Sequence, residues 1–336
     1  MRAMVINAPG GYDKFQSLPL ADPGQPGPGQ IRVRVHATSL NYHDYSVVVG
    51  RMNLQGRRIP MSDAGGVVEA VGEGVEMFQP GDAVVSVFHP NWQGGKVPHL
   101  EGFAQVPGDG IDGYACEAVV TPASWFTRAP KGYSHEEAAT LTTAGLTAWR
   151  ALIVNGGLKA GDSVLVLGTG GVSIFALQIA KAMGARVMVT SSCDQKLARA
   201  KALGADHLVN YKSQPQWGQA AVEWTQGLGV DHVIEVGGPG TLPQSITAVA
   251  QGGHIALMGV LTGISGDVPT AAFMRKQAKI QGLLVGSRDD QLDFIRAIEA
   301  TSLRPVIDKS FALEDMAEAF RYQESGAHFG KITLRY

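Results

Sequence analysis

A glycine-rich turn at Gly168, Gly170 and Gly171 carries the clearest chemical potential in this sequence. The apolar run Val164–Leu167 precedes it, and such a run is typical of a parallel strand buried on both faces. Residues 174–183 follow with helical spacing. Glycine permits the tight turn and lets a pyrophosphate approach the backbone, and helix N-terminal N–H groups attract anions. This context predicts a dinucleotide-binding site.

The composition limits the classes of protein to consider. At 336 residues, 45% of them hydrophobic and 17% charged, the chain is long enough for two globular domains. A net charge of −2 gives no electrostatic reason to expect nucleic acid or a membrane surface as partner. The N-terminus reads as a strand, not a signal peptide, and two cysteines cannot form a disulfide framework. We therefore expect a cytoplasmic protein.

The pattern of elements changes along the chain. Residues 1–126 are expected to be β-rich, with a half-buried strand over 31–37 and a long irregular loop over 90–113. After residue 134 the pattern becomes helical over 136–155, and strands and helices then alternate. Such βαβ repetition predicts a doubly wound parallel sheet, hence an α/β fold. The last expected elements are a strand over 279–286, a helix and a terminal strand.

Several segments together resemble the signature of the medium-chain dehydrogenase/reductase superfamily: Gly65–Val75 with Gly81-Asp82, Ala138–Trp149, Leu203–Asp206, Asp231–Gly238 and Gly330–Ile332. Within that superfamily the chain is most similar to the zinc-free, quinone oxidoreductase-like branch.

The resemblance implies a GroES-like β-rich catalytic domain, formed by residues 1–126 and 287–336. A Rossmann NADP-binding domain, residues 127–286, would be inserted into it, with the active site in the cleft between them. The resemblance also implies a homodimer through the edge strand at 279–285. An exposed apolar edge favours pairing over a covered edge in a monomer.

Zinc-dependent relatives bind a catalytic metal through Cys, His and Cys. By resemblance these positions are Asn41, Ser62 and Thr143 or its neighbour Thr142, and none is a good zinc ligand. A rearranged His/Asp site among the scattered histidines stays open as an alternative. We expect no metal, so the substrate oxygen would be polarised by hydrogen bonds.

The end of the second Rossmann strand indicates which nicotinamide is bound. NAD-specific sites place an acid there, whereas this chain has Ser191 and Ser192, with Lys196 soon after. Two serines and a lysine suit a 2′-phosphate better than a diol, so we expect NADPH. Tyr211 matches the position that stacks near the adenosine phosphate in zinc-free relatives. Lys196 as a solvated charge and Tyr211 as a packing residue remain the alternatives.

The resemblance extends the cofactor site to the nicotinamide face, to further strand ends and to backbone groups near the carboxamide. The full expected set is Thr147, Gly168, Gly170, Gly171, Val172, Ser191, Ser192, Lys196, Tyr211, Val236, Gly237, Gly259, Val260, Leu284 and Val285.

Asn41, His43 and Asp44 are the candidate catalytic residues. His43 maps to the hydroxyl that relays protons in zinc-dependent alcohol dehydrogenases, and a neutral histidine is a competent donor near pH 7. Asn41 would hold a carbonyl oxygen, while a structural acceptor is the alternative for Asp44. Tyr45 and Trp92 would stack on a flat substrate, with core packing as the alternative.

These residues predict an NADPH-dependent oxidoreductase that reduces quinones or α,β-unsaturated carbonyls by hydride transfer without a metal. One alternative is an NAD(P)-dependent alcohol/aldehyde dehydrogenase of the zinc-type family, disfavoured because alkoxide formation is hard without a metal. Another is a non-catalytic NADPH-binding protein, since fold does not fix function. The expected partner is a small-molecule quinone or carbonyl substrate.

Overall fold

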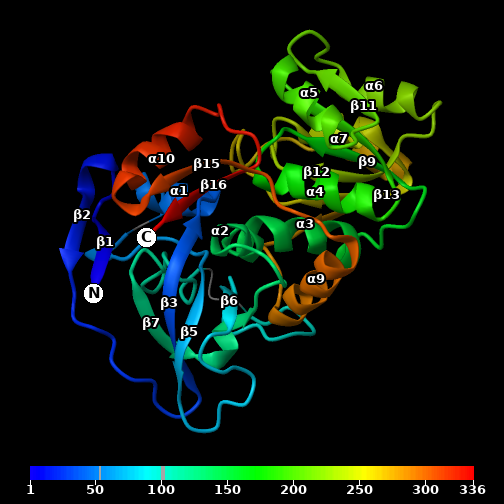
Figure 1. Cartoon of the computed structure of the whole chain (residues 1–336). Coiled ribbons are helices and arrows are strands. Elements are labelled where there is room, and N and C mark those ends of the chain that lie inside the picture. Colours follow the sequence, from blue (N-terminus) through cyan, green and yellow to red (C-terminus); the bar gives the residue numbers. More distant parts are fainter. Residues whose placement is uncertain (53, 100–102) are drawn as a thin grey trace. The chain divides into compact units, whose positions relative to one another are not determined.

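The computed structural model describes residues 1–52, 54–99 and 103–336 (Figure 1). The chain forms two compact units, Met1–Leu146 with Val285–Tyr336, and Thr147–Leu284. The segment 127–146, predicted as part of the second domain, belongs to the first unit. The reason is packing, because helix α2 (His135–Ala139) lies against β3, β5 and β6 of the first unit.

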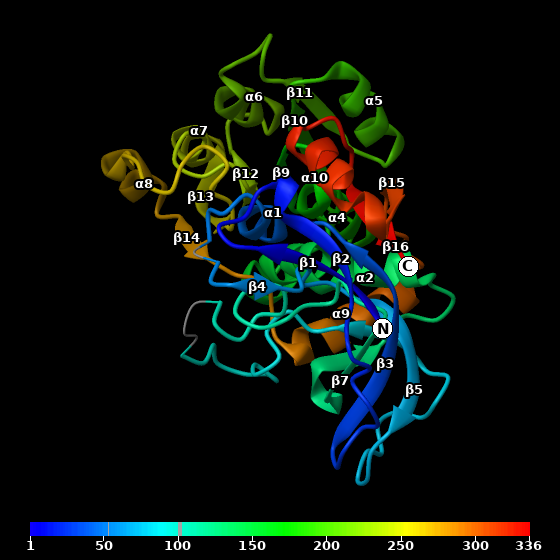
Figure 2. The same cartoon turned by 90° about the vertical axis from the view of Figure 1, so that its left-hand side faces the viewer.

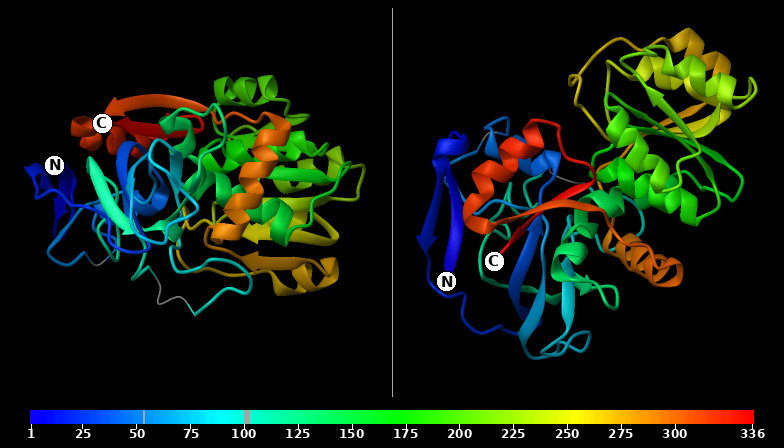
Figure 3. Two further views of the ribbon diagram at one scale, coloured as in Figure 1. Left: turned by 60° about the horizontal axis from the view of Figure 1, so that its bottom comes forward. Right: turned by 45° about the horizontal axis from the view of Figure 1, so that its top comes forward.

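In the first unit, the described residues form a seven-stranded sheet in the order β15-β16-β3-β5-β6-β8, with β7 also paired to β3. Its strands are β3 (Gln30–Ser39), β5 (Gly65–Val71), β6 (Ala83–Ser86), β7 (Ala118–Pro122), β8 (Phe126–Arg128), β15 (Ile307–Ala312) and β16 (Lys331–Arg335). Figure 3 shows the C-terminal strand β16, in red, beside β3, in blue.

The central strand β3 shows why this sheet forms. Ile31 and Val33 are fully buried, whereas the alternating Arg32 and Arg34 face outward. Both arginines bind Glu69 on β5, with Nε–carboxylate distances of 2.7 and 2.6 Å. An apolar inner face and paired charges on the other side fix the register of the sheet.

A second, three-stranded sheet has the order β2-β1-β4 and is visible near the N-terminus in Figure 2. It consists of β1 (Arg2–Asn7), β2 (Phe15–Pro19) and β4 (Arg57–Arg58). The remaining elements of the unit are α1 (Tyr42–Val48), α2, α9 (Arg288–Thr301), α10 (Met316–Glu324), the π-helical turn η3 (Leu141–Gly145) and the 3₁₀ turns η1 (Tyr12–Lys14), η2 (Ala123–Trp125) and η5 (Leu313–Asp315).

The second unit holds a six-stranded sheet in the order β11-β10-β9-β12-β13-β14, paired in parallel throughout its described residues. Its strands are β9 (Ser163–Leu167), β10 (Arg186–Ser191), β11 (His207–Asn210), β12 (Val230–Glu235), β13 (Val249–Leu257) and β14 (Lys279–Gly282). Its helices are α3 (Leu146–Trp149, which begins at the unit boundary), α4 (Gly171–Ala182), α5 (Asp194–Ala202), α6 (Trp217–Trp224), α7 (Leu242–Ala248), α8 (Thr270–Lys276) and the π-helical η4 (Arg150–Asn155).

Strand β9 is buried along its whole length, as expected for a strand covered on both faces. Leu165 and Leu167 pack in one apolar cluster with Trp217 of α6 and Ile246 of α7. The strand order reverses beside β9, which is the switch point of a doubly wound sheet. The predicted α/β fold class is therefore confirmed.

Some predicted elements were wrong in detail. The helical pattern of 136–155 is interrupted by η3 and η4, because apolar spacing alone does not distinguish α from π turns. The strand expected over 279–286 ends at Gly282. Helix α8 was missed, since it buries no residue and shows no apolar period. The loop 90–113 contains no helix or strand among its described residues, and residues 100–102 lie outside them.

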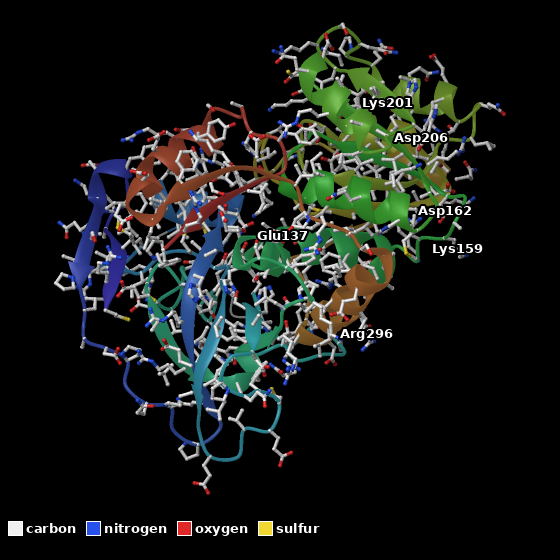
Figure 4. All side chains as sticks on the ribbon, viewed as in Figure 1. Glu137, Lys159, Asp162, Lys201, Asp206 and Arg296 are labelled. Carbon is white, nitrogen blue, oxygen red and sulfur yellow. The ribbon has the colours of Figure 1, made fainter. Side chains whose placement is uncertain are left out.

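Acidic side chains of the second unit gather at the amino ends of its strands. Asp162 and Asp206, labelled in Figure 4, immediately precede β9 and β11. Asp162 accepts the N–H of Lys159 at 2.8 Å, and Asp206 accepts that of Val187 at 2.7 Å. Because a dinucleotide binds at the opposite, carboxyl ends of the strands, these acids lie away from that edge.

No helix of the described residues is long and apolar enough to cross a membrane. Both cysteines, Cys116 and Cys193, are free thiols, and the cytoplasmic location stays a prediction.

Gly259 tests how tightly the carboxyl ends of β12 and β13 are packed. A Cβ there would lie 1.7 Å from the carbonyl oxygen of Val236, so Gly259→Ala must displace backbone. We expect it to lower the free energy of unfolding by about 1–3 kcal/mol or more, measured by urea denaturation. Gly282→Ala, at an open position, is the control and should change it by less than about 0.5 kcal/mol. Equal effects of the two substitutions would contradict the packing argument.

Candidate functional site

The predicted phosphate-binding turn has the required backbone geometry. Gly168 follows β9 with φ of 73°, a left-handed conformation that favours glycine. Ser173 donates to the carbonyl oxygen of Leu167 at 2.7 Å, which ties the first turn of α4 to the strand. Within the described chain no side chain caps α4 at Gly170. The N–H groups of Gly171 and the residues just after it, including Val172, are therefore suited to an anion.

The residues expected around the 2′-phosphate lie at the ends of β10 and β11. Tyr211 donates its N–H to the carbonyl oxygen of Ser191 at 3.0 Å, and its side chain is 41% exposed. Ser191 is buried and its hydroxyl accepts the N–H of Cys193 at 3.3 Å. Ser192 and Lys196 are half-buried at the start of α5. These two side chains are thus more accessible than Ser191.

The nearest acid along the chain to this position is Asp194, the first residue of α5. Its carboxylate accepts a hydrogen bond from the side-chain amide of Asn210 at 2.7 Å. That bond directs the carboxylate toward the end of β11, where Asn210 is the last residue before Tyr211.

Glu235 supports the turn that carries predicted cofactor residues, and sequence reasoning missed this role. It is fully buried at the end of β12, and its Oε1 accepts the N–H groups of Gly237 and Gly238 at 2.8 and 3.0 Å. The Thr241 hydroxyl donates to the same oxygen at 2.6 Å, and the Ser245 hydroxyl donates to Oε2. The sequence signal for this residue was an acidic residue at the end of a strand. These bonds fix the turn that carries the predicted contact residues after β12.

The remaining predicted cofactor residues are placed in different surroundings. Val260 and Leu284 are each 48% exposed, while Thr147 is buried in α3. Val285 is buried with φ of 48°, which is strained for a β-branched residue. Such strain is often kept where a backbone position matters for function.

In the first unit, a buried polar cluster surrounds Asp63. Its Oδ1 accepts the Thr143 hydroxyl at 2.6 Å, and its Oδ2 accepts the Ser39 hydroxyl at 2.5 Å and the Asn41 amide at 2.8 Å. The ammonium of Lys331 lies 3.8 Å from the same carboxylate. We call Ser39, Asn41, Asp44, Asp63, Thr143 and Lys331 the Asp63 cluster.

The Asp63 cluster holds one ammonium and two carboxylates, all buried. The second carboxylate, Asp44, accepts the N–H groups of Asn41 and Ser62 at 3.0 and 2.9 Å. Burial raises the pKa of Asp63 to about 6 and raises the pKa of Asp44, while burial lowers the pKa of Lys331. The ammonium opposes the first two shifts, so the three groups depend on one another.

This geometry corrects the role predicted for Asn41. Its amide nitrogen donates to Asp63 and Asp44, at 2.8 and 3.0 Å, so both hydrogens are used. Its Oδ1 accepts from Lys331 at 2.5 Å. Asn41 therefore has no donor left for a substrate oxygen, and Asp44 serves as a cap of α1. Both residues act as structural members of the cluster.

The same geometry tests whether a zinc ion fits here. Asn41 and Thr143, at two of the ligand positions of zinc-dependent relatives, are bonded to Asp63, and the Lys331 ammonium adjoins Asn41. A cation beside a buried ammonium is repelled, and none of these side chains is a ligand that zinc prefers. No group of three or more His, Cys, Asp or Glu side chains in the described chain is placed to hold a metal. The residues do not fit a metal.

His43 lies on α1, and its ring is 13% exposed. Its Nε2 is 3.5 Å from Oδ2 of Asp109, and burial lowers the pKa of the imidazole. The rings of Phe88 and Phe103 lie 5.4 and 4.4 Å away between centroids. Asp109 was missed from the sequence because it lies in the irregular loop, where spacing gives no signal.

Tyr45 and Trp92, predicted to stack on a substrate, are 6% and 3% exposed. Tyr45 packs in the apolar core and donates its hydroxyl to Glu324 at 2.7 Å. The ring of Trp92 lies 6.2 Å from that of His89. This burial argues against the predicted contacts, because a stacking platform must present a face to the ligand.

The chain combines a β-rich unit with a parallel-sheet unit that carries a dinucleotide turn. This combination is typical of two-domain nicotinamide-dependent oxidoreductases. The family model described as an alcohol dehydrogenase GroES-like domain matches residues 27–131, and the one described as a zinc-binding dehydrogenase matches residues 171–301. The chain belongs to the medium-chain dehydrogenase/reductase superfamily, as its motifs predicted.

Several relatives match this chain over nearly their full length. A "zinc-type alcohol dehydrogenase-like protein" of Schizosaccharomyces pombe is 42% identical over 100% of this chain and 99% of its own. A crystal structure from Sinorhizobium meliloti 1021 matches with a TM-score of 0.91 and 39% identity, covering 100% of this chain and 99% of that one. Another, of an NAD-dependent alcohol dehydrogenase, matches with a TM-score of 0.90 and 37% identity over 100% of both.

More distant matches have names that include a substrate or a cofactor. An acryloyl-coenzyme A reductase of Sulfurisphaera tokodaii is 26% identical over 100% of both chains. A mycobacterial structure complexed with NADPH matches with a TM-score of 0.82 and 25% identity over 100% of both chains. The superfamily therefore includes both NAD- and NADP-binding members.

The charge balance of the Asp63 cluster can be tested by removing its only cation. Lys331→Met leaves two buried carboxylates, and we expect it to lower the free energy of unfolding by about 3–5 kcal/mol, measured by urea denaturation. Lys131→Met, on the surface of the same unit, should change it by less than about 0.5 kcal/mol.

The double variant Lys331→Met/Asp63→Asn removes one charge of each sign. It should recover part of the lost stability, because the two sites are coupled. A Lys331→Met protein as stable as the Lys131→Met control would show that the cluster does not depend on its ammonium.

Proposed function

We propose that this protein is an NADPH-dependent reductase of quinones or α,β-unsaturated carbonyls that works without a metal. The observation that carries the proposal is the Asp63 cluster. Its ammonium and hydrogen bonds occupy Asn41 and Thr143, at two of the positions where zinc-dependent relatives bind their metal. Without a Lewis acid, oxidation of a simple alcohol is difficult, whereas hydride addition to a quinone or enone gives a less basic oxyanion.

The choice of NADPH is supported by the end of β10. Ser191, Ser192 and Lys196 stand where an acid would bind the ribose hydroxyls of NAD. The carboxylate of Asp194 is engaged with Asn210, and the ring of Tyr211 is exposed beside Ser191. The NADPH complex of the mycobacterial neighbour agrees with this choice. Another neighbour is NAD-dependent, so the cofactor preference must be measured.

The residues predicted to bind the cofactor and the residue predicted to donate a proton have separate roles in this reaction. A bound nicotinamide supplies the hydride. The α4 N-terminus and the turn fixed by Glu235 bind and orient the dinucleotide. In the first unit, His43 would protonate the reduced substrate. Its ring is partly exposed, and imidazole is the side chain that most often serves as a general acid in enzymes.

A second candidate, alcohol/aldehyde interconversion, is favoured by the names of two relatives that match over the whole chain. It keeps the cofactor site and changes the substrate, so oxidation of simple alcohols distinguishes it. A third, a non-catalytic NADPH-binding role, predicts binding without turnover.

We also propose a homodimer through the edge strand, residues 279–285. In the described sheet β14 is terminal and pairs with β13 alone, leaving its other edge open. Exposed apolar residues near it in sequence, Met274 and Leu284, favour a covered edge over an open one.

The substrate class and metal independence can be tested together. Purified protein should oxidise NADPH with benzoquinones or with α,β-unsaturated ketones, and should keep this activity in EDTA. Simple primary alcohols should give no NADP⁺ reduction under the same conditions. Stoichiometric zinc by elemental analysis, with activity lost on chelation, would contradict the proposal. Binding of NADPH with no turnover of any acceptor would favour the non-catalytic role.

Cofactor preference should be measurable as affinity. We expect NADPH to bind at least tenfold more tightly than NADH, equivalent to about 1.4 kcal/mol, in a fluorescence titration. Lys196→Ala should weaken NADPH and leave NADH nearly unchanged. Lys201→Ala, further along α5 and labelled in Figure 4, is the control and should affect neither. Equal dissociation constants for the two cofactors would rule out a 2′-phosphate site here.

The proton donor can be tested at His43. His43→Phe should lower kcat by roughly a hundredfold, within the range for a general acid. NADPH affinity should barely change, because His43 is not among the predicted cofactor residues and all of these except Val285 belong to the second unit. Enones should be affected more than quinones, since an enolate is a stronger base than a hydroquinone anion. An unaltered kcat would mean that solvent protonates the product.

A further inference from the structure

One pair of titratable groups in the first unit is not explained by the family resemblance. Nε2 of His43 and Oδ2 of Asp109 are 3.5 Å apart, and both atoms are buried. Neither atom has a hydrogen-bond partner among the described residues. Leaving two such atoms buried and unmatched is unfavourable, so their mutual orientation needs a reason.

The surroundings hold the imidazole in one orientation. Phe88 meets its ring edge-on, at an interplanar angle of 77°, and Phe103 lies 4.4 Å from it at 47°. The ring is 13% exposed although Nε2 is buried. The exposed part of the ring therefore consists of ring atoms other than Nε2.

Burial lowers the pKa of His43 and raises the pKa of Asp109, and the charges of the two partners oppose these shifts. Asp109 and Asp63 both act to raise the pKa of His43, against the effect of burial. The pKa of Asp109 is raised by burial and by Asp44, and His43 and Arg58 act to lower it. Arg58 also lies 3.5 Å from Asp112, on the same loop as Asp109. Each partner of the pair thus makes the charged form of the other more favourable.

We infer that Asp109 is a positioning residue for proton transfer, and that it directs Nε2–H of His43 toward itself so that Nδ1 delivers the proton to the reduced substrate. This inference rests on the proposed reductase function. It supplies that function with the group that a general-acid histidine needs, an acceptor that fixes the ring and stabilises the imidazolium.

The proton transfer is balanced. After hydride has moved to the substrate, the Nδ1–H bond of the His43 imidazolium breaks and an O–H or C–H bond forms on the oxyanion or enolate. The imidazolium becomes neutral imidazole, and Asp109 stays ionised and bonded to Nε2–H. A proton from solvent then restores the imidazolium, so each turnover uses one hydride and one proton.

The test compares Asp109→Asn with the matched variant Asp112→Asn, which removes the same charge from the same loop. Asp109→Asn should lower kcat for enones by about tenfold to a hundredfold with little change in KM for NADPH. Asp112→Asn should leave kcat unchanged, because the amide oxygen it introduces can still accept the N–H of Ile59. In a His43→Phe background, Asp109→Asn should have no further effect on kcat.

Nitrogen NMR gives a readout that does not depend on turnover. The His43 signals are assigned as those lost in His43→Phe. In the wild-type protein neutral His43 should be the Nε2–H tautomer, and its titration midpoint should fall in Asp109→Asn but not in Asp112→Asn. The Nδ1–H tautomer, or equal midpoints in the two variants, would overturn the inference.

The outcomes separate this inference from the proposed function. If the wild-type protein turns over no quinone or enone, the proposed function fails, while the NMR result still decides whether the pair exists. If turnover depends on His43 but not on Asp109, the function stands and the positioning role is wrong. Should Asp109→Asn fail to fold, the wild-type tautomer decides the inference.

Discussion

The buried carboxylate of Asp63 is the interaction on which the first unit depends. It gathers donors from the end of β3, from η3 and from β16, which are far apart in sequence. A buried charge is tolerated only when it is paired and hydrogen-bonded, so these segments must meet at one point for the fold to be stable. Met61, two residues earlier, has φ of 81°, and the surrounding structure keeps this strained backbone in place.

Glu235 plays a comparable part in the second unit. Its carboxylate is satisfied by donors within the ten residues that follow it, so the turn after β12 is fixed before any ligand arrives. Gly259 then lies against Val236, close enough that no Cβ fits between them. In both units an internal acid replaces water as the partner of backbone and hydroxyl groups. The result is a preorganised surface, which reduces the entropy lost on binding.

The same frame serves different chemistries in this superfamily, because function depends on the side chains placed on it. Here the polar interior that zinc-dependent relatives give to a metal holds an ammonium and two carboxylates. The side chains of His43 and Asp109, 13% and 18% exposed, lie in the same unit. The chemistry we propose follows from that difference.

The sequence by itself determined the class of fold, the order of the Rossmann elements and the position of the dinucleotide turn, because these depend on local period and on glycine at Gly168. It also indicated family membership through motifs spread along the chain. Only the tertiary structure decided that Asn41 is fully engaged, that Tyr45 and Trp92 are buried, and that residues 127–146 belong to the first unit. The position of Asp109 next to His43 was also decided by the tertiary structure, because Asp109 lies in an irregular loop. Such contacts join residues with no fixed spacing, so no sequence period records them.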